Sequence, residues 1–119
     1  MRIKPKYFIV LGSTLFTLSI AQSTIAAAGN PAEGAQTFDS ICSSCHGDKG
    51  VTEIPGIPVF SKGERMSKAD EQLKKSIKNG VNNPNNPAGM TMPPYGGGPE
   101  LNDKQLSNVI AYIRTLKKK

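Results

Sequence analysis

The sequence of 119 residues contains no tryptophan, a single histidine, two cysteines and few aromatic residues of any kind. Beyond residue 28 it has no long hydrophobic run, and 28 of the remaining 91 residues are apolar. A chain this short, with so few hydrophobic residues, struggles to bury enough surface to fold alone. These shortages argue against a large enzyme, a multidomain assembly or a long coiled coil. They predict a small domain that is stabilised by a disulfide, a metal or a cofactor.

A strong excess of one charge is also missing once the first residues are set apart. The chain has 15 basic and 9 acidic residues, and three of the basic ones lie within the first six positions. The part after residue 28 therefore carries a net charge of +3, with both signs mixed. No basic run is interleaved with aromatic residues, so the sequence argues against nucleic-acid binding.

The first 28 residues have the three parts of a secretory signal peptide. Three basic residues give a positive start, residues 8–20 are mostly apolar, and a small-residue cleavage site ends at Ala28. An uncleaved membrane anchor is the alternative, but this apolar stretch of 13 residues is shorter than the roughly 20 needed to span a bilayer. We therefore expect a signal peptide over residues 1–28, cleavage near Ala28, a mature domain over residues 29–119 and a location in the periplasm.

Both cysteines and the histidine fall in one string, Cys42-Ser43-Ser44-Cys45-His46. A disulfide across so short a loop would stabilise little and would leave His46 unexplained. A thioredoxin-like redox pair belongs beside a strand–helix–strand pattern, which the sequence lacks. A structural zinc site needs four ligands, and this string offers three.

The same spacing is that of a c-type haem attachment site. Two thiols separated by two residues can add across the haem vinyl groups to form thioethers. The residue after the second cysteine is then held beneath the iron, where the imidazole of His46 becomes the proximal ligand. We expect Cys42 and Cys45 to bind one haem c covalently, and the flat haem to replace part of the missing core.

Capping residues and apolar spacing predict helices and no strands. Asn30 can cap a helix that begins with Pro31, and Asn102 can cap a last helix with Gln105 three residues later. In that last helix an apolar stripe recurs at helical spacing, formed by Leu106, Val109, Ile110, Ile113 and Leu116.

A middle helix is expected over residues 68–79, with Ser67 as its cap and Glu71 paired with Lys75. Residues 82–89 are too rich in Pro and Asn for a regular element. The fold class predicted from the residues is therefore all-α.

Three segments in this order resemble class I cytochrome c, and in particular its small bacterial c5-like and c6-like members. They are residues 34–38 before the cysteines, the Met-Pro-rich segment 90–97, and the ending 101–113. The resemblance covers essentially all of residues 29–119. It implies the class I cytochrome c fold, with three to four helices around one covalent haem. It also implies that Gly34 lets the last helix cross close by, with Phe38 packed against Val109 and Tyr112.

The resemblance further implies a second iron ligand. Met92 stands directly before Pro93, as in the Met-Pro pattern of the family, while Met90 and an open sixth site are the alternatives. A backbone carbonyl near a proline, at Pro58 or Pro55, is expected to accept a hydrogen bond from the other ring nitrogen of His46.

An iron held by His46 and Met92 leaves no position for a substrate, so we expect a one-electron carrier rather than an enzyme. The expected partners are redox proteins bound transiently, with the chain a monomer and with lysines available to steer an acidic partner. A haem c subunit of a larger periplasmic oxidoreductase is the alternative. A gas- or peroxide-binding haem protein would require the methionine assignment to fail.

Overall fold

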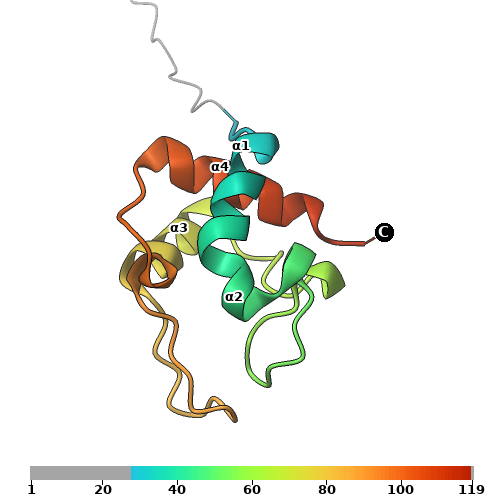
Figure 1. Ribbon diagram of the computed structural model, residues 1–119, viewed down its shortest axis with the longest axis vertical. Helices are drawn as coiled ribbons and strands as arrows, with labels where there is room; N and C mark the ends of the chain where they lie inside the picture. Colours follow the sequence, from blue (N-terminus) through green and yellow to red (C-terminus); the bar gives the residue numbers. More distant parts are fainter. Residues whose placement is uncertain (1–27, 119) are drawn as a thin grey trace, which may run out of the picture.

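The computed structural model describes residues 28–118, which form three helical stretches joined by loops (Figure 1). The predicted all-α fold is confirmed: within this range no strand forms, and extended pairing is limited to one isolated bridge between Val81 and Met92. The helices are α1 (Pro31–Thr37), continued by the π-helical turn η1 (Phe38–Cys42) and α2 (Ser43–His46), then α3 (Asp70–Asn79) and α4 (Asp103–Thr115). Short 3-10 turns occupy Asp48–Gly50, Phe60–Lys62 and Pro94–Gly97.

The caps expected for the first and last helices are both confirmed. The Asn30 side chain accepts a hydrogen bond from the N–H of Ala32 at 2.9 Å, and Pro31 is the first helical residue. Asn102 and Gln105 cap α4 reciprocally, since the N–H of each donates to the side-chain oxygen of the other at 3.0 and 2.9 Å. Each cap satisfies N–H groups that have no partner within the helix.

The two terminal helices cross at very short range, as drawn at the top of Figure 1. A Cβ atom placed on Gly34 would lie 1.9 Å from the carbonyl oxygen of Asn108 in α4. Beside this crossing the Asn108 side chain is buried, and it donates to a carboxylate oxygen of Glu33 at 2.7 Å. The expected role of Gly34 is confirmed, because a larger residue would push the helices apart.

Below the crossing lies a small apolar core. The rings of Phe38 and Tyr112 meet at 5.3 Å between centroids, and Phe38 and Val109 are fully buried. The expected stripe on α4 faces this core, with Leu116 half-buried at its edge. The buried residues of the stripe are Leu106, Val109, Ile110 and Ile113.

The predicted start and pairing of the middle helix are wrong. α3 begins at Asp70 rather than Lys68, because Arg114 of α4 binds the segment before it. The Arg114 guanidinium donates to the backbone carbonyls of Met66 and Lys68, each at 2.7 Å, and to the Asp70 carboxylate. These bonds hold the preceding backbone outside the helix.

Within α3, Glu71 pairs with Lys74 at 2.9 Å rather than with Lys75. Residues three apart on a helix are neighbours, as are residues four apart.

None of the helices within residues 28–118 is long and apolar enough to cross a membrane. Residues 1–27, which hold nearly all of the predicted signal peptide, lie outside the described part of the chain.

Replacing Gly34 with alanine should lower the free energy of unfolding of the haem-loaded protein by about 1–3 kcal/mol, because the new methyl group meets the backbone of α4. On helix propensity alone the same change would stabilise the protein by about 1 kcal/mol, so the sign is informative. Denaturant unfolding gives the value. Gln36→Ala, at an exposed position of the same helix, is the control and should stay within about 0.5 kcal/mol.

Candidate functional site

The Cys42–His46 string ends the first helical stretch. Cys45 and His46 belong to α2, and Cys42 is the last residue of η1. Gly47 then turns the chain with φ +76°, and a Cβ atom there would lie 1.7 Å from the carbonyl oxygen of Val51. Its N–H donates to Ser43 at 2.8 Å and closes the helix. The sharp turn after His46 therefore requires glycine.

The π-helical turn decides which way His46 faces. Eight residues of a regular α-helix would place His46 about 80° away from Phe38 around the helix axis. A π-helical turn takes up about one extra residue, which brings the two side chains to within about 20° of each other. Their rings accordingly lie 6.5 Å apart between centroids. This turn directs His46 toward the core, and no local pattern in the sequence indicated it.

Both thiols are half-buried and neither is bonded to the other. Burial, with a smaller effect from the nearby Cys45, raises the pKa of the Cys42 thiol to about 11. A thiol with so high a pKa holds almost no thiolate at neutral pH, whereas a redox-active Cys-x-x-Cys pair depends on thiolate. The thioredoxin-like alternative is thereby disfavoured on physical grounds.

His46 lies against an aromatic wall. Its ring stacks on Phe60 at 4.7 Å between centroids, with 17° between the planes. Phe60 in turn meets Phe38 edge-on at 6.3 Å. Phe60 is buried, and Gly50 packs closely against its side chain. A Cβ atom on Gly50 would lie only 2.8 Å from the Phe60 Cβ.

The imidazole of His46 is held in the form that a metal accepts. Burial lowers its pKa, while the backbone carbonyl of Pro58 opposes this shift. Nδ1 is buried and makes no full hydrogen bond, so the Pro58 carbonyl acts on the ring without reaching ordinary hydrogen-bond geometry. Of the two candidate prolines it is thus Pro58 that acts on His46, although the expected hydrogen bond does not meet ordinary geometry. A neutral imidazole can act as a metal ligand through the ring nitrogen that does not face the Pro58 carbonyl.

Met92 lies on a different segment, fixed at the end of α3. The N–H of Val81 donates to Met92 at 2.8 Å, and the N–H of Met92 donates to Val81 at 3.0 Å. Gly80 allows this approach, because a Cβ atom there would lie 2.4 Å from the Met92 carbonyl oxygen. Met92 is half-buried, whereas Met90 is 38% exposed.

The chain beyond Met92 returns to the helix that carries the cysteines. A Cβ atom on Gly98 would lie 2.9 Å from the side chain of Ile41, which directly precedes Cys42. Gly96 faces the same side chain with φ +65°. The methionine segment and the cysteine helix are thus packed together through two glycines that leave room for Ile41.

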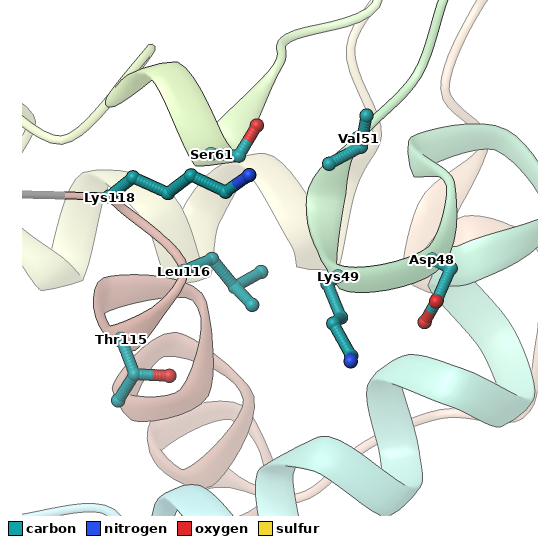
Figure 2. Close-up of a pocket in the computed structure, with 7 residues that line it drawn as sticks. All are labelled: Asp48, Lys49, Val51, Ser61, Thr115, Leu116 and Lys118. Carbon is teal, nitrogen blue, oxygen red and sulfur yellow. The ribbon is translucent and has the colours of Figure 1, made fainter.

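A surface cavity of about 520 Å³ lies between the turn at residues 48–51 and the end of α4 (Figure 2). Lys49 and Lys118 are among the residues that line it, and the backbone N–H of Lys118 donates to the carbonyl of Ser61 at 3.1 Å. A second cavity, of about 720 Å³, lies between α3 and α4 beside Gly29. Neither cavity is lined by the cysteines, His46 or Met92.

The residues present fit a c-type haem. Two free thiols are separated by two residues, the imidazole of His46 directly follows the second of them, and an aromatic wall supports this imidazole.

The chain matches the family described as cytochrome c oxidase, cbb3-type, subunit III over residues 29–113. A cytochrome c6 of Synechococcus sp. is 32% identical over 107 aligned residues, covering 87% of this chain and 86% of that protein. A cytochrome c-555 of Chlorobaculum thiosulfatiphilum is 31% identical over 83 residues, covering 69% of this chain and 91% of that protein. No solved structure gives a significant match.

Truncation of Phe60 to alanine should lower the free energy of unfolding of the haem-loaded protein by about 3–5 kcal/mol, since it removes a buried ring that supports His46. Val51→Ala, at a side chain that is 50% exposed, is the comparison and should cost about 0.5 kcal/mol. Thermal unfolding followed by circular dichroism measures both. Similar losses for the two variants would mean that Phe60 is not the support described.

Proposed function

We infer that this chain, which belongs to the class I cytochrome c family of small monohaem proteins, is a periplasmic one-electron carrier between redox proteins. The family carries one covalent haem c, and the Cys42/Cys45 pair of this chain is consistent with that attachment. When bound, the haem supplies an iron that alternates between Fe(III) and Fe(II). The polypeptide holds this group and limits the access of water and ligands to it.

The observation that carries the proposal is the Cys42–His46 string on one helical turn. In this proposal the thiols of Cys42 and Cys45 form the two thioethers, and His46 is the proximal iron ligand. The stacking on Phe60 and the turn at Gly47 both support a ring fixed in a single orientation. A fixed ligand reduces the rearrangement that accompanies a change in oxidation state.

Met92 is the proposed distal ligand. The paired backbone bonds to Val81 and the partial burial of Met92 support a sulfur at a defined position. Met90 lies in the exposed part of the same loop. A neutral thioether favours reduced iron and raises the potential relative to two imidazoles, as suits a carrier.

We propose that contacts with partners are transient and polar, because two haem propionates would lower the net charge of the mature domain from +3 to about +1. Any steering must then come from local lysines. Lys74 and Lys78 are engaged by Glu71 and Asp103, each at 2.9 Å. Three other candidates have no carboxylate within 4.0 Å among residues 28–118, namely Lys62, Lys68 and Lys75.

A haem c subunit of a larger periplasmic oxidoreductase is the second candidate. The match to a family described as an oxidase subunit favours it. Both candidates use the same one-electron chemistry and differ in how long the partner stays bound. Purification from the native source under mild conditions distinguishes them, since a permanent subunit would elute with a larger chain and a free carrier would elute alone.

The test of the proposed function is the visible spectrum of the native protein, oxidised and reduced, before and after carbon monoxide. We expect a low-spin c-type spectrum with the weak methionine–iron band, unchanged by carbon monoxide, because both axial positions are filled. A high-spin spectrum that shifts with carbon monoxide would show an open sixth site. The carrier proposal would then be replaced by a gas- or peroxide-binding function.

Met92→Ala should abolish the methionine–iron band, admit carbon monoxide and lower the reduction potential, because the sixth position loses its thioether. Met90→Ala is the matched control two residues away and should change neither the band nor the potential. Spectroelectrochemistry of both variants gives the comparison. The reverse pattern would assign the distal ligand to Met90.

We also propose that residues 1–28 are a signal peptide and that the mature domain begins at Gly29. Two contacts with α4 support this boundary. Gly29 packs so closely that a Cβ atom there would lie 2.0 Å from the Ser107 carbonyl oxygen, and the Asn30 N–H donates to the Asn108 side-chain oxygen at 2.7 Å. Both residues thus contact α4, as expected of the first residues of a mature domain. Intact-mass measurement of the exported protein should give residues 29–119 plus one haem. Recovery of the full chain in the membrane fraction would indicate an uncleaved anchor.

A further inference from the structure

One polar side chain organises the exposed loop that precedes Met92. From Val81 to Thr91 every residue is exposed except Asn86, which is half-buried. The Oδ1 atom of Asn86 accepts the N–H of Ala88 at 2.9 Å, and its Nδ2 atom donates to the carbonyl of Met90 at 3.0 Å. Both ends of the amide are therefore used within the loop, and the second bond fixes the backbone two residues before Met92.

The same amide also touches the loop that follows the cysteine helix. A Cβ atom on Gly56 would lie 2.4 Å from Oδ1 and 3.0 Å from Nδ2 of Asn86. Gly56 has φ +82°, so both its backbone conformation and the space around it require glycine. The Asn86 amide rests directly on the Gly56 backbone.

This contact joins the two segments that hold the proposed iron ligands. Gly56 is two residues before Pro58, whose carbonyl acts on His46. Asn86 fixes Met90, and the next paired backbone bond belongs to Met92. Without Asn86, the residues between Val81 and Met92 would be held to the rest of the domain mainly at the stem of the loop.

We propose that Asn86 is a positioning residue that holds the loop of residues 81–92 against the loop containing Gly56 and Pro58. It thereby keeps the sulfur of Met92 at the iron. The inference rests on the proposed function, since it assumes Met92 as the distal ligand. Asn86 does not touch the iron in this account. It acts through the loop, and its loss lets the sulfur leave more often and admits outside ligands.

The chemistry of the amide makes the proposal specific. Aspartate has nearly the same shape and can still accept the Ala88 N–H, but it cannot donate to the Met90 carbonyl. Asn86→Asp therefore removes one bond and places a charge beside a carbonyl oxygen. Asn86→Ala removes both bonds and the contact with Gly56.

The experiment measures carbon monoxide binding to the reduced haem-loaded protein, together with the methionine–iron band and the potential of the oxidised and reduced pair. Asn86→Ala and Asn86→Asp should each speed carbon monoxide binding, by about tenfold for the alanine variant, given the usual net worth of two hydrogen bonds. Both should weaken the band and lower the potential. Asn85→Ala, at an exposed position in the same loop, is the control and should behave like the unsubstituted protein.

Gly56→Ala tests the other side of the contact. It should also speed carbon monoxide binding, because the new methyl group displaces the Asn86 amide. In the double variant with Asn86→Ala, Gly56→Ala should speed carbon monoxide binding less than it does in the unsubstituted protein, because the Asn86 amide that it displaces is already absent. Fully additive effects would contradict a shared contact.

Two outcomes would overturn the proposal, and they are distinguishable. If the unsubstituted protein itself binds carbon monoxide readily and lacks the methionine–iron band, the proposed function fails and the role of Asn86 falls with it. If the unsubstituted protein is closed and the Asn86 variants differ from it in unfolding stability alone, the proposed function stands. Asn86 is then an ordinary structural residue of the loop.

Discussion

The close crossing of α1 and α4 is the constraint on which the rest of the domain depends. Gly34 lets the two backbones approach to a distance that leaves no room for a Cβ atom. The buried Asn108 side chain stabilises this crossing, because it donates a hydrogen bond to Glu33 and accepts one from the backbone N–H of Asn30. Because the two helices come from opposite ends of the described chain, their contact fixes the frame onto which the segment between them is folded.

A series of packed rings connects this helix crossing to the functional site. Tyr112 of α4 meets Phe38, Phe38 meets Phe60, and Phe60 stacks on His46, with centroid distances between 4.7 and 6.3 Å. The π-helical turn allows it, because it places Phe38 and His46 on the same side of their helix. The histidine side of the site is thus built on buried aromatic packing, which is rigid.

The methionine side is built differently. Its loop carries little buried apolar surface and is held by backbone bonds between Val81 and Met92, by the glycines that pack on Ile41, and by Asn86. Such contacts are individually weak. Under the proposed ligation, buried packing fixes the histidine ligand, whereas the methionine ligand depends on a few polar contacts in an exposed loop.

The sequence by itself determined the features that depend on neighbouring residues. Helix caps, the apolar stripe of α4 and the Cys-x-x-Cys-His spacing are local patterns, and the fold class and family follow from them. Tertiary structure decided what depends on residues far apart in the chain. Arg114 of α4 sets where α3 begins, and Phe60 becomes the partner of His46. Asn86 was recognisable as a turn residue, but its contact with Gly56 was not, because two loops of irregular sequence meet only once the helices have fixed their ends.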